Sequence, residues 1–288
     1  MTETSLELVS EHRCFDGTQR FYRHHSDTIG LPMGFSVFLP PQAQENKVPV
    51  LFYLAGLTCT EETFMIKAGA QRFAAQHGIM LVAPDTSPRG AGVAGEDENW
   101  DLGTGAGFYV DATQEPWSQH YRMETYIASE LYELVTQQLP GDAARAGIFG
   151  HSMGGHGALV LAQRHREKFQ SVSAFAPIAA PSRCPWGEKA FTAYLGSDRQ
   201  AWASHDASLL MEQSQCPFPQ SILIDQGLDD SFLAQQQLLP EAFEAACAQA
   251  QQPLVLRRHE GYDHGYYFIS TFMEDHMAFH AERLSSSA

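Results

Sequence analysis

Runs of apolar residues alternate along the chain with segments that have helical periodicity. Nearly continuous apolar runs, typical of strands buried on both faces of a parallel sheet, lie at residues 48–54, 79–83, 146–149, 172–175, 221–224 and 254–256. Helical segments lie between these runs, at residues 61–76, 124–139, 154–165, 240–249 and 268–283. The alternation predicts an α/β fold with a mostly parallel, doubly wound sheet flanked by helices. Functional loops should then lie at the carboxyl ends of the strands.

The first 40 residues have a different pattern. Short extended segments lie at residues 6–14, 19–24 and 34–39, and an Asp16-Gly17 turn separates the first two. We therefore expect antiparallel N-terminal strands that lead into the parallel part of the sheet. A chain of 288 residues can form one large core, so we expect a single domain over residues 1–288.

Composition and charge exclude several classes of protein. The sequence is 44% hydrophobic and 11% aromatic, which is typical of a globular chain. A net charge of −16 argues against nucleic acid as a partner, because such binders need clusters of Lys and Arg. No apolar run is as long as a membrane span, and the N-terminus does not resemble a secretory signal. Five scattered cysteines without a CxxC pair favour reduced thiols in a cytoplasmic protein over a disulfide framework or a zinc site.

One motif points to chemistry. Residues 150–154 read Gly-His-Ser-Met-Gly, a G-x-S-x-G sequence between a predicted strand and a predicted helix. In this context the serine lies on a tight turn, and the small residues on either side let strand and helix approach each other. We therefore predict that Ser152 is the nucleophile of an acyl-enzyme mechanism on an α/β-hydrolase fold. The alternative is a glycine-rich turn without catalytic function.

A nucleophilic serine needs a histidine base and an acid that orients the base. On this fold they follow the serine in the order acid, then histidine. Asp230 follows a predicted buried strand, and His264 lies in a glycine-rich loop after the last strand. We predict that these two residues complete a catalytic triad with Ser152.

The sequence contains other histidines and aspartates that could serve as the base or the acid of the triad. His151 and His156 flank the serine, but we expect the turn to direct them away from its hydroxyl. Among the aspartates, Asp225 could be a structural residue at the strand end, and Asp229 or Asp263 could be solvated or could cap a loop. The spacing alone leaves these alternatives to Asp230 open.

The negative oxygen formed during acyl transfer needs two backbone N–H donors, which together form an oxyanion hole. Met153, directly after the nucleophile, should supply one donor. The loop after the strand at residues 48–54 should supply the other, and Leu57 is our candidate because Gly56 permits the turn that aims an amide inward. Alternatively, Gly56 merely ends the strand.

These residues lie within longer strings that closely resemble the S-formylglutathione hydrolase family, also called esterase D. The strings are LAGLTCTEE (54–62), DTSPRG (85–90), WDLGTGAGFYVDAT (100–113), GHSMGGHGA (150–158), CPWG (184–187) and GYDH (261–264). The resemblance covers nearly the whole chain. It implies hydrolysis of the small molecule S-formylglutathione to formate and glutathione, with side activity on short-chain esters. It also implies a cytoplasmic homodimer.

The resemblance assigns roles to three residues. The family's acid is the second aspartate of an Asp-Asp pair, which is Asp230 here. The family's loop cysteine corresponds to Cys59, which would lie near the nucleophile and contact the substrate, although a small buried apolar role is equally compatible with the sequence. Trp186 matches a tryptophan beside the pocket, although a core aromatic would look the same.

The predicted mechanism uses only side chains, backbone amides and water, so we expect no metal and no organic cofactor. Two other functions compete with this prediction. A broad carboxylesterase or an acyltransferase would use the same scaffold and the same serine. A catalytically silent binding protein would share the fold, but the ordered Ser, Asp and His argue against it.

Overall fold

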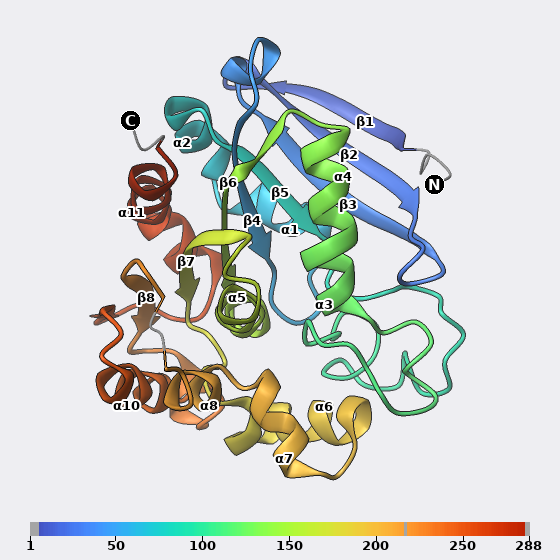
Figure 1. The fold of residues 1–288 in the computed structure, drawn as a ribbon, viewed down its shortest axis with the longest axis vertical. Helices are drawn as coiled ribbons and strands as arrows, with labels where there is room; N and C mark the ends of the chain where they lie inside the picture. Colours follow the sequence, from blue (N-terminus) through green and yellow to red (C-terminus); the bar gives the residue numbers. More distant parts are fainter. Residues whose placement is uncertain (1–5, 216–217, 286–288) are drawn as a thin grey trace.

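The computed structural model describes residues 6–215 and 218–285 and contains one mixed sheet of nine strands (Figure 1). In chain order the strands are β1 (Glu7–Cys14), β2 (Gly17–His25), β3 (Pro32–Leu39), β4 (Val48–Leu54), β5 (Met80–Pro84), β6 (Gly141–His151), β7 (Phe169–Phe175), β8 (Ile222–Gly227) and β9 (Leu254–His259). Their order across the sheet is β1-β2-β3-β5-β4-β6-β7-β8-β9. The pairs from β1 to β3 and from β3 to β5 are antiparallel. All later pairs are parallel.

Helices cover both faces of the sheet. They are α1 (Glu61–Lys67), α2 (Ala70–His77), α3 (Met123–Thr125), α4 (Tyr132–Gln137), α5 (Met153–Arg164), α6 (Pro185–Leu195), α7 (Arg199–Trp202), α8 (Ala207–Glu212), α9 (Ser231–Ala234), α10 (Pro240–Ala250) and α11 (Tyr266–Leu284). Helices α1, α2 and α11 pack on one face, and α4 and α5 pack on the other. Figure 1 shows α4 and α5 in front of the central strands. The predicted fold class, a doubly wound sheet with antiparallel N-terminal strands, is therefore confirmed.

Two predicted helices are interrupted. The segment 61–76 forms α1 and α2, because Gly69 adopts a left-handed conformation with φ of 66° and separates them. The segment 124–139 contains a π-helical stretch, Tyr126–Leu131, between α3 and α4. Helices α6 to α8 lie between β7 and β8, where the hydrophobic pattern did not indicate any helix.

The central strands form the core and also position the site. Every residue of β5 and β8 is buried, and β4 has only Pro49 partly exposed. Because β4, β6 and β8 run parallel, their carboxyl ends meet at one edge of the sheet. The segments that follow these strands begin at Ala55, Ser152 and Leu228, and they carry most of the predicted site residues.

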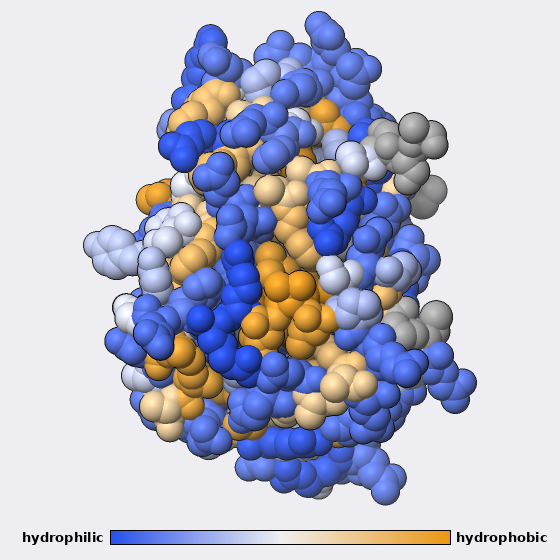
Figure 2. All heavy atoms as spheres, turned by 90° about the vertical axis from the view of Figure 1, so that its left-hand side faces the viewer, coloured by the Kyte–Doolittle hydropathy of each residue, from blue (hydrophilic) through white to orange (hydrophobic). Residues whose placement is uncertain are grey.

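The surface is largely polar. Figure 2 shows the side that carries α2 and α11, where hydrophilic residues surround a smaller area of apolar residues. Across residues 6–215 and 218–285, none of the helices has the length and apolar character needed to cross a membrane.

Candidate active site

A small cavity lies at the carboxyl edge of the sheet and collects residues from distant parts of the chain. Its volume is about 230 Å³. The lining residues come from the segments after β4, β6, β8 and β9 and from α6 and one long loop: Gly56, Leu57, Thr58, Cys59, Trp100, His151, Ser152, Trp186, Phe232, His264 and Tyr266. Ser152 and His264, which are 112 positions apart in the sequence, thus face one cavity.

Ser152 lies on a strained turn between β6 and α5. Its backbone has φ of 56° and ψ of −117°, a region that non-glycine residues rarely adopt and that costs on the order of 1–3 kcal/mol. The surrounding backbone holds the turn: the Ser152 amide donates to the Phe175 carbonyl at 3.0 Å, and the Ser152 carbonyl accepts from the amides of His156 and Ile178. The side chain of Ser152 is thereby fixed at the end of the central strand.

The glycines of the motif are required by close backbone contacts. A Cβ atom on Gly154 would lie 1.9 Å from the Leu54 carbonyl oxygen, and one on Gly150 would lie 2.2 Å from the Gly154 carbonyl oxygen. Gly56 has a similar function after β4, since its Cβ would lie 3.2 Å from the Ser152 Cβ. Glycine at these positions lets the loop after β4 approach the serine turn.

Asp230 and His264 form a direct hydrogen bond. The Nδ1–H of His264 donates to Oδ2 of Asp230 at 2.6 Å, which fixes the tautomer that leaves Nε2 as the acceptor. Oδ1 of Asp230 accepts from the amides of Phe232 at 2.8 Å and Leu233 at 3.3 Å and so caps α9. Burial raises the pKa of Asp230, but the hydrogen bond and charge of His264 and the amide donors outweigh this effect, and the pKa lies below its usual value. The carboxylate is thus held in its charged form.

The competing aspartates have other contacts. Asp225 is fully buried and forms a two-fold ion pair with Arg257, in which both N–O distances are 2.6 Å. Oδ1 of Asp263 accepts from the Gly265 amide at 2.8 Å and caps the loop there. The side chain of Asp229 is exposed. Within residues 6–215 and 218–285, Asp230 is the aspartate that is hydrogen-bonded to His264.

The two histidines beside the serine differ from each other. His156 is buried within the fold, where its Nε2 is 3.1 Å from the Phe108 carbonyl oxygen. His151, which we expected to point away from the serine hydroxyl, lies in the wall of the same cavity with its ring centroid 4.4 Å from that of His264. Burial, together with the charge of His264, holds the pKa of His151 well below its usual value, so the ring stays neutral. The packing of His151 against His264 is a feature that the sequence did not reveal.

The predicted oxyanion donors are both close to the serine turn. Leu57 lines the cavity, and Met153 is the first residue of α5, where N–H groups have no partner within the helix. The amides next to Leu57 are occupied: Thr58 donates to Gly105 at 2.9 Å, and Cys59 donates to Gly56 at 3.3 Å. In the described part of the chain, neither the Leu57 amide nor the Met153 amide donates to a backbone carbonyl of the loops and turns.

The remaining predicted residues, Cys59 and Trp186, also line the cavity. Burial raises the pKa of the Cys59 thiol, which keeps it protonated and a poor nucleophile. The Trp186 ring contacts the rings of Trp100 and Phe232 at centroid distances of 5.6 and 4.8 Å. Trp186 therefore belongs to an aromatic wall of the cavity.

Sequence reasoning did not select Trp100, Phe232 or Tyr266. Trp100 comes from the irregular segment between β5 and α3, and 55% of its surface is exposed beside the cavity. No periodic pattern marks such a residue, and the string at 100–113 contained it without giving it a role in the site. Over residues 6–215 and 218–285, we find no cluster of three or more His, Cys, Asp or Glu side chains suited to a metal ion.

Comparisons with known proteins agree with this geometry. Residues 26–279 match the family described as "Putative esterase". The chain is 55% identical over 280 residues to the S-formylglutathione hydrolase of Paracoccus denitrificans (strain Pd 1222), covering 97% of this chain and 99% of that one. It is 50% identical over 281 residues to the S-formylglutathione hydrolase of Rattus norvegicus, covering 98% and 99% of the two chains.

A solved structure gives the same result. The S-formylglutathione hydrolase from Agrobacterium tumefaciens superposes with a TM-score of 0.94 at 49% identity, covering 97% of this chain and 100% of that one. The likeness extends over nearly the whole chain. The resemblance seen in the sequence strings is thereby confirmed, and the chain belongs to the S-formylglutathione hydrolase family of α/β hydrolases.

Proposed function

We propose that this protein hydrolyses S-formylglutathione to formate and glutathione by way of a formyl group carried on Ser152. The observation that carries the proposal is the Asp230–His264 hydrogen bond of 2.6 Å, formed at a cavity that Ser152 also lines. The family relationship supports the choice of thioester as substrate. The same site should also turn over short-chain esters with good leaving groups.

The first half of the reaction forms the acyl-enzyme. Nε2 of His264 takes the proton of the Ser152 hydroxyl as Oγ attacks the formyl carbon. The carbonyl oxygen becomes negative, and the N–H groups of Leu57 and Met153 stabilise it. The C–S bond then breaks as the carbonyl re-forms, and the protonated His264 gives its proton to the glutathione sulfur, which leaves as the thiol and returns His264 to its neutral form.

The second half releases formate. Water gives a proton to Nε2 of His264 and attacks the carbon of the formyl ester, which forms a second oxyanion in the same place. The bond to Oγ breaks, and His264 returns the proton to Ser152. Each step uses groups of this chain and water, so we expect activity to survive treatment with a chelator.

The size and walls of the cavity favour a small acyl group. At about 230 Å³ it is smaller than most pockets that enclose whole ligands. Leu57, Trp186 and Phe232 give it apolar walls. A formyl group fits beside Ser152, while the much larger glutathionyl group must extend beyond the cavity.

The test compares two substrates. We expect kcat/KM for S-formylglutathione to exceed that for p-nitrophenyl acetate by at least about 100-fold, because binding of the leaving group should contribute to transition-state stabilisation. A marked preference for the ester would instead favour a broad carboxylesterase. The accumulation of transfer products when alcohols or thiols are added would favour an acyltransferase.

A probe of the serine separates an enzyme from a silent binding protein. A fluorophosphonate reagent should label the wild-type protein and should fail to label Ser152→Ala. Labelling that persists in Ser152→Ala would place the nucleophile elsewhere. We further propose a cytoplasmic homodimer, and analytical ultracentrifugation that detects only monomer at micromolar concentration would contradict the dimer.

A further inference from the structure

The proposed substrate carries charges that the cavity does not match. The glutathionyl group has two carboxylates and one ammonium group, whereas the residues that line the cavity include no Asp, Glu, Lys or Arg. The protein itself carries a net charge of −16, which repels a negatively charged substrate at long range. A positive group at the edge of the cavity is therefore needed to hold a carboxylate.

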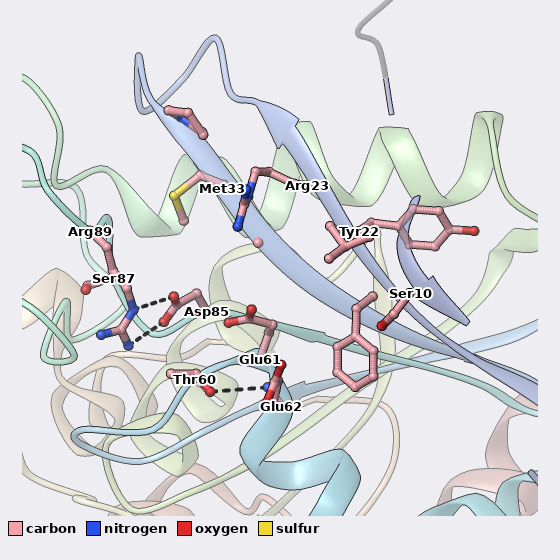
Figure 3. A pocket seen from close by; sticks show the side chains of 14 residues that line it. Ser10, Tyr22, Arg23, Met33, Thr60, Glu61, Glu62, Asp85, Ser87 and Arg89 are labelled. Carbon is pink, nitrogen blue, oxygen red and sulfur yellow. Dashed lines mark hydrogen bonds and ion pairs between the residues drawn. The ribbon is translucent and has the colours of Figure 1, made fainter. Parts of the chain in front are cut away.

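Three cations lie next to residues that line the cavity, and two of them are already paired. Arg89 donates to the Cys59 carbonyl at 3.2 Å, but its guanidinium also binds both oxygens of Asp85, at 2.6 and 2.9 Å. Figure 3 shows this pair in a separate cavity of about 510 Å³, where Glu61 and Glu62 add further negative charge.

Lys189 is the second paired cation. Its ammonium group is hydrogen-bonded to the carboxylate of Asp101, the residue after Trp100, and also lies 3.3 Å from Oδ1 of Asn99. These contacts attach residues 99–101, which include Trp100, to α6. The charge of Lys189 is thus neutralised where it stands.

Lys67 is the third cation and has no such partner. It is the last residue of α1, its side chain is exposed, and its Nζ lies 5.7 Å from the centroid of the Tyr266 ring, which lines the cavity. Among the ion pairs within 4.0 Å in the described part of the chain, none includes Lys67. Burial raises the pKa of the Cys59 thiol, and the positive charge of Lys67 opposes that rise, so the charge reaches this wall of the cavity.

We infer that Lys67 binds one of the glutathionyl carboxylates and so helps the site to select this leaving group. The inference rests on the proposed function and adds a residue that determines specificity. Lys67 lies at the C-terminal end of α1, whereas Glu61 and Glu62 at its first turn line the other cavity. The helix therefore places its acidic side chains at the other cavity and Lys67 beside Tyr266, a residue of the active-site cavity.

The test measures kcat/KM for three substrates with wild type, Lys67→Met and Lys67→Glu. The substrates are S-formylglutathione, the neutral formyl thioester of 2-mercaptoethanol, and p-nitrophenyl acetate. For S-formylglutathione we expect a loss of about 3-fold in Lys67→Met and about 10-fold in Lys67→Glu, as for one exposed ion pair and its replacement by repulsion. The two neutral substrates should change by less than about 2-fold, and the loss should shrink in 0.5 M salt.

Lys47→Met is the matched control. Lys47 is exposed and precedes the N-terminal end of β4, on the order of 20 Å from the site at the other end of that strand. Lys47→Met removes the same charge as Lys67→Met. We expect kcat/KM for all three substrates to stay at the wild-type values. Equal losses on all substrates, or no selective loss in Lys67→Glu, would overturn the inference. A wild-type enzyme that prefers the ester would instead defeat the proposed function, which keeps the two failures distinct.

Discussion

At the scale of single residues, Asp230 uses its two carboxylate oxygens for different purposes. Oδ1 accepts the amides of Phe232 and Leu233 and caps α9, while Oδ2 accepts from His264 and from the side chain of Gln226. The cap fixes the carboxylate before any substrate binds, so the histidine that it orients is fixed as well. A local helix start thus contributes directly to the geometry of the proposed reaction.

The Asp230→Asn variant separates the capping of α9 from the orientation of His264. Asp230→Asn keeps an oxygen that can cap α9 but loses the charge that stabilises a protonated His264, and its amide favours the wrong tautomer. We expect kcat for S-formylglutathione to fall by a factor on the order of 10³–10⁴, with little change in melting temperature. Asp229→Asn, one residue away on the surface, is the control and should keep wild-type kcat. If Asp229→Asn instead proved the inactive variant, the acid would be misassigned.

The sequence predicted the site residues that belong to a motif or to a fixed chain order. It did not predict the residues that reach the cavity through tertiary packing. Ser152 and His264 follow from a motif and a chain order, and the structure places both at one cavity. Spacing could not separate Asp230 from Asp225 because both follow the strand predicted at 221–224. In the structure Asp225 lies within β8, and the contact with His264 distinguishes Asp230. Trp100 and His151 reach the cavity through tertiary packing, which no local pattern records.

At the scale of elements, the site depends on how closely β4, β6 and α5 approach one another. The first turn of α5 lies against the end of β4, with the Gly154 backbone beside the Leu54 carbonyl. The strained Ser152 connects β6 to α5, and its conformation persists because strand and helix both hold it. The order strand, motif, helix was readable from the sequence because each element has its own period.

The Gly154→Ala variant tests whether the close contact between α5 and the end of β4 is required. Its Cβ would lie 1.9 Å from a backbone oxygen that cannot move without displacing β4, so we expect a loss of at least about 3 kcal/mol in the free energy of unfolding, together with loss of activity. Gly69→Ala is a matched comparison. Gly69 also has a conformation that favours glycine, with φ of 66°, but a Cβ there meets no atom within 4 Å, so only about 1 kcal/mol of backbone strain is expected. Urea unfolding should rank the two variants in this order, and equal losses would contradict the steric explanation.

The helical segment predicted at 61–76 is divided into two helices, and the reason lies in how these elements pack. Its apolar positions continue across Gly69, so periodicity alone gave one helix. The left-handed glycine ends α1 and lets α2 start in another direction, where it packs against α11. A glycine inside an amphipathic pattern is tolerated in some helices and ends others, and tertiary contacts decide between these outcomes.

At the scale of the whole molecule, buried histidines link the sheet to its helices. The imidazole of His280 lies between the hydroxyls of Ser171 and Ser173 on β7, at 2.7 and 2.8 Å. His276 lies between Ser173 and Asp225, at 2.8 and 3.3 Å. Both histidines belong to α11, so this network attaches the last helix to the centre of the sheet. The composition showed 13 histidines but could not show which of them are buried.

Burial gives these histidines a common effect on stability. It lowers the pKa of His24, His151, His156, His205, His276 and His280 below the ordinary value of 6.5. In the unfolded chain the same side chains take up protons below pH 6.5, whereas in the folded protein they stay neutral. Falling pH therefore favours the unfolded state, and the stability from this source is complete above pH 6.5 and is lost below it.

His156, whose pKa burial lowers to about 4, allows a quantitative prediction. This residue alone should reduce the free energy of unfolding by about 1.4 kcal/mol at pH 5.5 and about 2.6 kcal/mol at pH 4.5, relative to pH 7.5. Burial lowers the pKa of the other five histidines as well, so they add to this loss in the same direction. Urea unfolding at pH 7.5, 6.5, 5.5 and 4.5 measures the slope. His156→Gln keeps a donor for the Phe108 carbonyl but does not titrate, so its slope should be smaller by about 1.1 kcal/mol per pH unit between pH 6.5 and pH 4.5. An unfolding free energy that stayed constant between pH 7.5 and 5.5 would show that the histidines are not held neutral in the folded protein.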